Sequence, residues 1–128
     1  EAILMHSVSR IAFKGLINNI QTSWVKMGQE GVQACLNAGA NDIGGTLMNE
    51  SITRAAGADH GQEWHPQGIE ETIISMGRKP KMRTTSYDEA PQSRRELAFR
   101  ASTLTQIENT AAAKLQRSKK LDNIAQVL

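Results

Sequence analysis

The sequence predicts an α/β fold built on parallel strands, followed by a helical tail. Helical and strand-like patterns alternate over residues 1–46 with short connections, which is how parallel sheets are built. All ten glycines lie at or before Gly77, and Phe99 is the only aromatic residue after Tyr87. The chain therefore divides into residues 1–87, the α/β part, and residues 88–128, a helical tail that we expect to be partly disordered without a partner.

Patterns of apolar residues predict a helix, a strand and a second helix at the start of the chain. Residues 1–14 carry apolar side chains at helical spacing, and Gly15 follows as a stop signal. Residues 20–25 are rich in β-branched and aromatic side chains, which favours a strand. Residues 28–38 are again helical, and Gly39 stands at the C-cap position.

The elements that follow are marked mainly by their ends. A second strand is predicted over residues 40–46. We expect Ser51 to cap a helix and Pro66 to open another. The basic residues 78–83 are interpreted as a solvated surface segment, since most such runs are surface.

The tail has its own start signal. Pro91 blocks a helix upstream, and Ser93 with Glu96 has the spacing of a capping box. One or two helices are predicted from an apolar stripe at Leu97, Ala101, Leu104, Ile107, Ala111 and Leu115. A coiled-coil or docking surface is the functional alternative for this weak stripe.

The composition argues against several classes of protein. A net charge of +2 is too small to indicate a nucleic-acid or polybasic membrane surface. The chain has no long apolar run and no signal-peptide pattern, so we expect a cytoplasmic (intracellular) protein with no membrane and no nucleic-acid partner. Cys35, the single cysteine, cannot by itself hold a zinc ion or an iron–sulfur cluster, and we expect a small buried apolar side chain there.

Two parallel strands do not make a stable sheet alone. Parallel strands are normally buried on both faces, and a (β/α) barrel needs eight of them over about 250 residues. The chain starts at Glu1, inside a predicted helix and without an initiator Met, so we expect it to be the end of something larger.

Residues 38–51 carry the most informative motif, with Gly44 and Gly45 at the predicted carboxyl end of a parallel strand. Paired glycines let a ligand or a backbone approach closely, and polar residues follow where α/β folds place their active sites. The pair matches neither the dinucleotide fingerprint nor the phosphate loop. From these residues alone, a packing role and a functional role both stay open.

Four motifs in one order carry a family resemblance: residues 19–28 (NIQTSWVKMG), 39–58 (GANDIGGTLMNESITRAAGA), 60–63 (HGQE) and 83–87 (RTTSY). This part resembles the carboxyl-terminal part of the radical S-adenosylmethionine enzymes that make the deazaflavin chromophore FO. Within that group it is most similar to the aminouracil–tyrosine hydroxyphenyl transferases. The resemblance covers residues 1–87 and leaves the tail unexplained.

The resemblance implies a TIM-type (β/α) barrel in which a [4Fe–4S] cluster cleaves S-adenosylmethionine. The resulting radical fragments tyrosine and passes its 4-hydroxybenzyl group to 5-amino-6-(D-ribitylamino)uracil. The implied partners are these substrates, the remainder of the barrel and the ring-closing half or subunit of FO synthase. Because the family's three-cysteine loop is absent here, both cofactors would be bound mainly by other sequence, and we expect this chain alone to be inactive.

Barrel geometry then selects candidate substrate-binding residues. In the presumed seventh strand, either Gln21, Ser23 and Val25 or Ile20, Thr22 and Trp24 face the interior. The first set offers polar groups, so Gln21 and Ser23 are the candidates.

The presumed eighth strand supplies the other candidates. Thr46, Asn49 and Glu50 follow at its catalytic end, whereas Asn41 and Asp42 lie near its start, where a structural role is expected. Arg54 stands one turn after Glu50, either as an anion-binding residue or as an ion-pair partner of Glu50.

Two alternatives were weighed beside these candidates. His60 and His65, with Asp59 and Glu63, contain metal-binding side chains, but their spacing matches no compact metal motif and a loop is the plainer interpretation, so no metal ligand is predicted. The rival function from another class is a noncatalytic helical interaction module that uses the tail.

Overall fold

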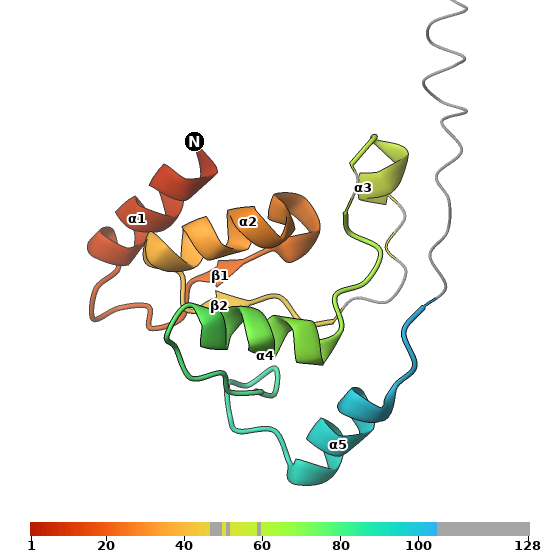
Figure 1. The fold of residues 1–128 in the computed structure, drawn as a ribbon. Coiled ribbons are helices and arrows are strands. Elements are labelled where there is room, and N and C mark those ends of the chain that lie inside the picture. The colour runs from red at the N-terminus through yellow and green to blue at the C-terminus, as the bar shows by residue number, and fades with distance from the viewer. Residues whose placement is uncertain (47–49, 51, 59, 105–128) are drawn as a thin grey trace, which may run out of the picture.

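The computed structural model describes residues 1–46, 50, 52–58 and 60–104 (Figure 1). Within these residues, helices and two short strands alternate at the start of the chain, and helices follow. The elements are α1 (Ala2–Ala12), β1 (Gln21–Thr22), α2 (Trp24–Asn37), β2 (Asp42–Ile43), α3 (Ile52–Ala55), α4 (Pro66–Ser75) and α5 (Gln92–Arg100). The mixed helix and strand content confirms the α/β class.

The two strands form a small parallel sheet. Gln21 pairs with Asp42, and Thr22 pairs with Ile43. Helix α2 contacts both strands and packs beside α1, and α4 contacts α5 (Figure 1). Among the described residues β2 has β1 as its one strand neighbour, so the other edge of β2 is open.

The core is built mainly from α2. Its buried apolar members are Trp24, Val25, Val32, Cys35, Leu36 and Ala40. Cys35 has no exposed surface and is a free thiol. The prediction that Cys35 is a small buried apolar residue is confirmed.

The first predicted strand, residues 20–25, is wrong beyond Thr22. Helix α2 begins at Trp24, and its first turn places Trp24 in the core, edge-to-face with Trp64 at a centroid distance of 6.3 Å. Strand propensity is weak compared with burying a Trp side chain, so tertiary packing decides the conformation. Gly28, with φ 65°, then interrupts the helical geometry, which is why the apolar pattern restarts there.

Other predicted elements fit better. The first helix is confirmed as α1, and Pro66 opens α4 as predicted. The second strand, predicted over residues 40–46, pairs only at Asp42–Ile43. One more hydrogen bond follows, from the Gly44 amide to the Thr22 carbonyl, before the glycine pair leads the chain away.

The start of the tail helix is a further correction. The amides of Arg94 and Arg95 bond to the Pro91 carbonyl, so α5 begins at Gln92 and Ser93 lies inside the helix. The predicted capping box is therefore wrong. The helix ends at Arg100 and Ala101 is extended, which interrupts the predicted apolar stripe. Ile107, Ala111 and Leu115 lie outside the described residues.

A hydrogen-bonded hub ties α1 to the strands. Arg10 donates to the Gly39 carbonyl and to Asn41 Oδ1, both at 2.7 Å, and the same Oδ1 accepts the Ile20 amide at 2.8 Å. Gly39 has φ 118°, and a Cβ atom there would lie 2.7 Å from Arg10 Cβ, so the close approach requires glycine. Asn41 thus has the structural role expected at the start of the strand.

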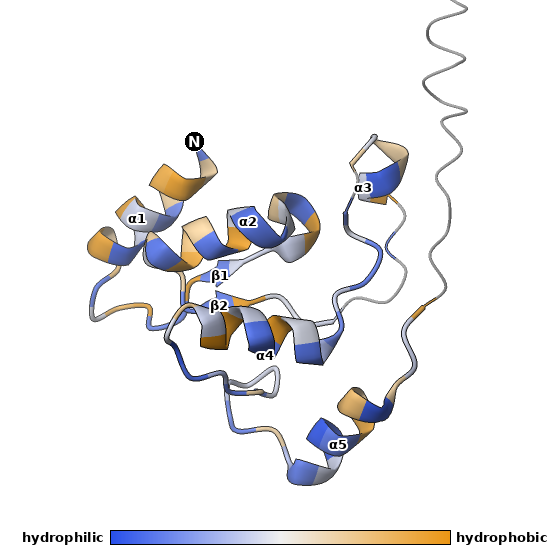
Figure 2. Cartoon of the chain, viewed as in Figure 1, coloured by the Kyte–Doolittle hydropathy of each residue, from blue (hydrophilic) through white to orange (hydrophobic). Residues whose placement is uncertain are grey.

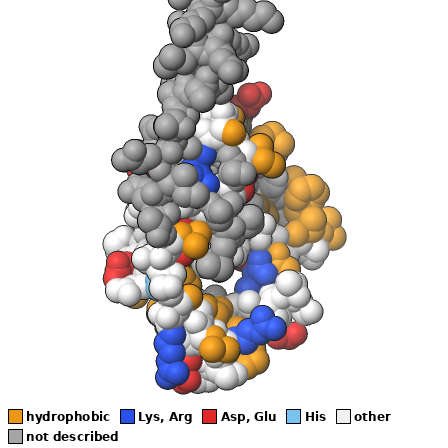
Figure 3. All heavy atoms as spheres, turned by 90° about the vertical axis from the view of Figure 1, so that its right-hand side faces the viewer, with side chains coloured by type: hydrophobic (Ala, Val, Ile, Leu, Met, Phe, Trp, Pro, Cys, Tyr) orange, Lys and Arg blue, Asp and Glu red, His pale blue; other side chains and the backbone are white. Residues whose placement is uncertain are grey.

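Helix α1 contains many hydrophobic residues (Figure 2). The exposed large hydrophobic residues of α1 and the turn after it are Ile3, Leu4, Met5, Val8, Ile11, Phe13, Leu16 and Ile17. The side view in Figure 3 also shows hydrophobic side chains gathered along one edge of the molecule. None of the helices in the described part of the chain has the length and apolar character to cross a membrane.

Candidate functional site

The Gly44–Gly45 turn lies directly after β2 and is tied to the neighbouring elements. The Gly44 amide donates to the Thr22 carbonyl at 3.0 Å, and the Trp24 indole Nε1 donates to the Gly45 carbonyl at 3.1 Å. These bonds hold the turn to β1 and to the first turn of α2. Thr46, a predicted substrate-binding residue, follows and is exposed, whereas Asn49 lies outside the described residues.

Glu50 caps the short helix α3. Its carboxylate accepts the amides of Ile52 at 2.8 Å and Thr53 at 3.2 Å. The Lys26 ammonium donates to Thr53 Oγ1 at 3.1 Å, which brings a positive charge from α2 toward the carboxylate. Ser51, the predicted cap, lies outside the described residues, and the capping side chain observed is Glu50.

The surroundings of Glu50 keep its carboxylate ionised. Burial by itself raises the pKa of this carboxyl group, but the hydrogen bonds from Thr53 and Ile52 and the charge of Lys26 outweigh it and leave the pKa lowered. Glu50 therefore carries a fixed negative charge just beyond the carboxyl end of β2.

This lowered pKa predicts acid sensitivity of α3. The ionised Glu50 cap stabilises the fold fully above the ordinary glutamate pKa of 4.5, and the stabilisation is lost as the pH falls through the lower pKa of the folded state. We expect the hydrogen-exchange protection of the Ile52 and Thr53 amides to fall between about pH 5 and about pH 3. In Glu50→Gln this dependence should disappear, and the same loss of protection in both proteins would contradict the prediction.

Arg54 lies mostly inside the molecule. It is 8% exposed, and its Nε donates to the Glu50 carbonyl oxygen at 3.1 Å. The i, i+4 relation to Glu50 predicted from the sequence is thus observed through the backbone carbonyl, while the Glu50 carboxylate serves as the helix cap. The loop after β2 therefore holds one acidic and one basic group in defined positions.

Ser23 and Gln21, the two substrate-binding candidates predicted from strand alternation, lie in different elements. Ser23 is the exposed N-cap residue of α2, so its assignment to a strand is wrong, because the helix begins one residue later. Gln21 is exposed in β1, and its side-chain amide donates to Asp42 Oδ2 at 2.9 Å. Buried Thr22 follows on the opposite face of the strand.

Asp42 is the centre of a cluster that sequence analysis missed. Arg83 forms a bidentate ion pair with its carboxylate, with Nε at 2.7 Å from Oδ1. The Arg83 guanidinium also stacks over the Tyr87 ring, 4.3 Å from its centroid. Hydrogen bonding to Asp42 raises the pKa of Arg83, although partial burial opposes this. The sequence did contain one signal for this cluster: Arg83 and Tyr87 are the first and last residues of one of the four family motifs.

A groove of about 850 Å³ runs beside β2. Residues 41–46 form one wall, and α4, residues 78–85 and α5 form the others. Its basic side chains are Arg78, Lys79, Lys81, Arg83 and Arg94. The groove leaves room for another segment of polypeptide beside β2.

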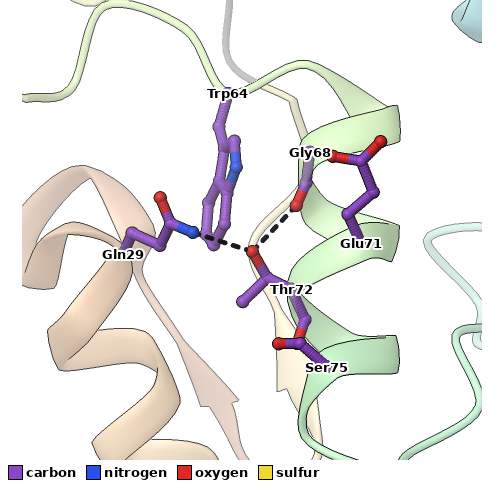
Figure 4. A pocket seen from close by; sticks show the side chains of 6 residues that line it. All are labelled: Gln29, Trp64, Gly68, Glu71, Thr72 and Ser75. Carbon is purple, nitrogen blue, oxygen red and sulfur yellow. Dashed lines mark hydrogen bonds between the residues drawn. The ribbon is translucent and has the colours of Figure 1, made fainter.

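A second, smaller hollow lies between α2 and α4 (Figure 4). Gln29 Nε2 donates to Thr72 Oγ1 at 3.0 Å, and this hydroxyl donates to the Gly68 carbonyl at 2.8 Å. Trp64 lies beside them. Because Gln29 and Thr72 bond to one another across the hollow, we assign it to helix packing.

Two of the residues with metal-binding side chains, His65 and Glu63, have other contacts, and Asp59 lies outside the described residues. His65 Nδ1 accepts the Gln67 amide at the start of α4, and Glu63 accepts the Leu104 amide. In the described ranges, no three His, Cys, Asp or Glu side chains gather in a metal-binding group. A [4Fe–4S] cluster needs several thiolates, and the buried Cys35 does not fit as one of them.

A known protein family shares this part of the chain. A family model described as the CofH/MqnC C-terminal region matches residues 1–96, from α1 into α5. The chain belongs to this family. The CofH/MqnC region thus contains the strand pair, the Gly44–Gly45 turn, the Glu50 cap and the Asp42–Arg83 pair, and the resemblance inferred from the four motifs is confirmed.

Three relatives are named 5-amino-6-(D-ribitylamino)uracil–L-tyrosine 4-hydroxyphenyl transferase, and the name of the third ends in the number 1. The chain is 54% identical to the protein from Methanocaldococcus jannaschii over 87 residues, 68% of this chain and 24% of the relative. It is 51% identical to the protein from Archaeoglobus fulgidus over 86 residues, 67% of this chain and 25% of the relative. It is 50% identical to the protein from Methanosarcina mazei over 102 residues, 80% of this chain and 26% of the relative.

The family model describes a C-terminal region, and the relatives are longer than this chain. The chain spans about a quarter of the length of the relatives it matches. No solved structure matches it.

Proposed function

We propose that this chain is the carboxyl-terminal part of a radical S-adenosylmethionine transferase. The enzyme would move the 4-hydroxybenzyl group of tyrosine onto 5-amino-6-(D-ribitylamino)uracil in deazaflavin biosynthesis. The observation that carries the proposal is the identity of 50–54% to relatives named as this transferase. The family match over residues 1–96 includes the strand pair and the loop after β2.

The remainder of a (β/α) barrel would complete the open sheet. β1 and β2 are parallel, and parallel strands are usually covered on both faces and paired on both edges. The groove beside β2 offers a place for a further strand, and the exposed apolar face of α1 offers a place for further barrel elements. Both surfaces support a division in which residues 1–87 belong to the barrel and residues 88–128 form the tail.

The loop after β2 would bind the substrates. Active sites of barrels lie at the carboxyl ends of the strands, where Thr46, Asn49, Glu50 and Arg54 follow β2. The fixed carboxylate of Glu50 suits the hydroxyl or amino groups of the ribitylaminouracil, and the guanidinium of Arg54 suits a carboxylate such as that of tyrosine. Gln21 and Ser23 would contribute polar groups near β1.

The cofactors would be held by the rest of the enzyme. The cluster and S-adenosylmethionine supply the radical chemistry when they are bound. The single cysteine, Cys35, is buried in α2 and is not placed to bind the cluster. The role proposed for this chain is therefore to bind and orient substrates. We propose that the 128 residues alone do not catalyse the transfer.

The test uses the full-length enzyme that contains this chain. After anaerobic reconstitution with iron and sulfide, it is incubated with S-adenosylmethionine, tyrosine and the ribitylaminouracil. We expect the brown absorption of a [4Fe–4S] cluster and, by mass spectrometry, an aminouracil enlarged by a hydroxybenzyl group. A full-length sequence without a three-cysteine loop, or a loaded enzyme that forms no such product, would overturn the proposal.

Glu50→Gln tests the role of the loop in this enzyme. The Gln side-chain carbonyl can still accept the Ile52 amide, so folding and cluster loading should be kept while the charge is lost. We expect transfer to fall by at least about tenfold, and we expect the effect to be non-additive with Arg54→Met. Unchanged turnover at normal cluster loading would assign the loop to packing alone.

A further inference from the structure

Helix α5 is fastened to α4 by an ion pair. The Arg95 guanidinium contacts both carboxylate oxygens of Glu70, at 2.8 and 2.7 Å. It also lies over the ring of Phe99, 4.4 Å from the centroid. The pair is half-buried, and it orients one face of α5 toward the start of α4.

His65 makes the second contact with this helix. Its ring packs edge-to-face against Phe99 at a centroid distance of 6.4 Å, and its Nε2 bonds to the Ala101 carbonyl at 3.2 Å. Its Nδ1 accepts the Gln67 amide, so the proton resides on Nε2, which donates to Ala101. One imidazole ring thus caps α4 and holds the end of α5.

Glu63 makes the third contact. Its carboxylate accepts the Leu104 amide at 2.7 Å. Ala101 has left the helical conformation, so residues 101–104 run in an irregular path past Glu63 and His65. These contacts explain why α5 stops at Arg100, because a continued helix would use the Ala101 carbonyl and the Leu104 amide internally.

Glu63 and His65 lie between α3 and α4, in a segment that packs against the loop of Glu50. Gly61, two residues before Glu63, lies against α3: a Cβ atom there would be 3.5 Å from Thr53 Cβ and 3.6 Å from Glu50 Oε2. Trp64, on the other side of Glu63, packs on Trp24. A short path of contacts therefore links residues 101–104 to the Glu50 cap.

We propose that residues 92–104 are a strap that holds the loop of Glu50 in its substrate-binding position, with Glu63 and His65 as positioning residues. The proposal rests on the proposed function for the class of ligand, a ribitylaminouracil. The family model ends at residue 96, so the strap is formed partly by sequence outside that match. The strap sets ligand affinity and leaves the chemical step to other groups.

Four variants of the full-length enzyme separate the contacts. Glu63→Ala removes the acceptor of the Leu104 amide, whereas Glu63→Gln keeps a carbonyl oxygen for it. His65→Asn keeps an N-cap acceptor for α4, but its shorter side chain places no donor at the position of Nε2, which contacts the Ala101 carbonyl. Glu96→Ala is the matched control, because Glu96 is exposed on the same helix and bonds to Gln92.

Two measurements are made on each protein: hydrogen exchange of peptides covering residues 50–65, and the Kd of the ribitylaminouracil by calorimetry. We expect Glu63→Ala and His65→Asn to speed exchange and raise Kd by about fivefold, with kcat within about twofold of the wild type. Glu63→Gln and Glu96→Ala should behave as the wild type does.

The outcomes distinguish the strap from the enzyme assignment. Unchanged exchange, or faster exchange with an unchanged Kd, overturns the strap. Absence of transfer in every protein, with Kd still shifted in the two strap variants, overturns the proposed function and leaves the strap standing. Absence of ligand binding by the wild type overturns both.

Discussion

Asp42→Ala is expected to lower the free energy of unfolding of the full-length enzyme by about 3 kcal/mol. The Asp42 side chain is 9% exposed and the Arg83 side chain 25% exposed, so the substitution leaves a largely buried guanidinium without its bidentate partner. Gln21 loses its acceptor in the same step. The shift of the urea unfolding midpoint at constant slope measures the loss.

Two further variants make the Asp42 experiment specific. Asp42→Ala combined with Arg83→Met should cost less than the two single losses together, with a coupling of at least about 1 kcal/mol. Lys81→Ala removes the exposed ion pair with Glu89 in the same segment, and its cost should stay below about 1 kcal/mol. Simple additivity of the Asp42 and Arg83 losses would show that the pair does not hold the segment.

Trp24→Ala is expected to be as damaging, with a loss of about 3–5 kcal/mol. The side chain is 3% exposed, packs on Trp64 and donates to the Gly45 carbonyl, so its removal opens the core and releases the turn after β2. The shift of the urea unfolding midpoint of the full-length enzyme, followed by circular dichroism, measures the loss.

Trp24→Phe separates packing from hydrogen bonding. It keeps an aromatic ring in the core but loses the donor to Gly45, so the expected cost is about 1–2 kcal/mol. A cost equal to that of Trp24→Ala would mean that the indole hydrogen bond, and not the buried ring, stabilises this region.

Local sequence signals predicted those elements in which tertiary packing favours the same conformation as the local pattern. The apolar spacing of residues 1–14 and the proline at position 66 each fix local geometry, and the structure has a helix at both places. Cys35 was predicted to be buried because it shares a helical face with Val32 and Leu36, and all three are in the core. The loop after β2 was selected as a site because its polar residues follow a glycine pair at the end of a parallel strand.

The candidate site was harder to predict in detail. Glu50 and Arg54 were correctly placed within one turn of each other, but the Glu50 carboxylate bonds to the amides of α3 and the Arg54 side chain to the Glu50 carbonyl. Sequence spacing reports which side chains share a helical face, whereas the choice between a charged partner and a backbone amide depends on the path of the loop. The strap contacts of Glu63 and His65 were not predicted, although Glu63 is the last residue of the HGQE motif.

The sequence by itself determined the α/β class, the helix at the start, the burial of Cys35 and, through four ordered motifs, the family. Those features depend on periodicity and on local stop signals, which act over a few residues. Tertiary structure alone decided that Trp24 begins a helix, that Asp42 pairs with Arg83, and that residues 101–104 leave the helix to meet Glu63. The free energy of each of these comes from groups about twenty to forty residues apart in sequence, and no local pattern records which distant partner will be there.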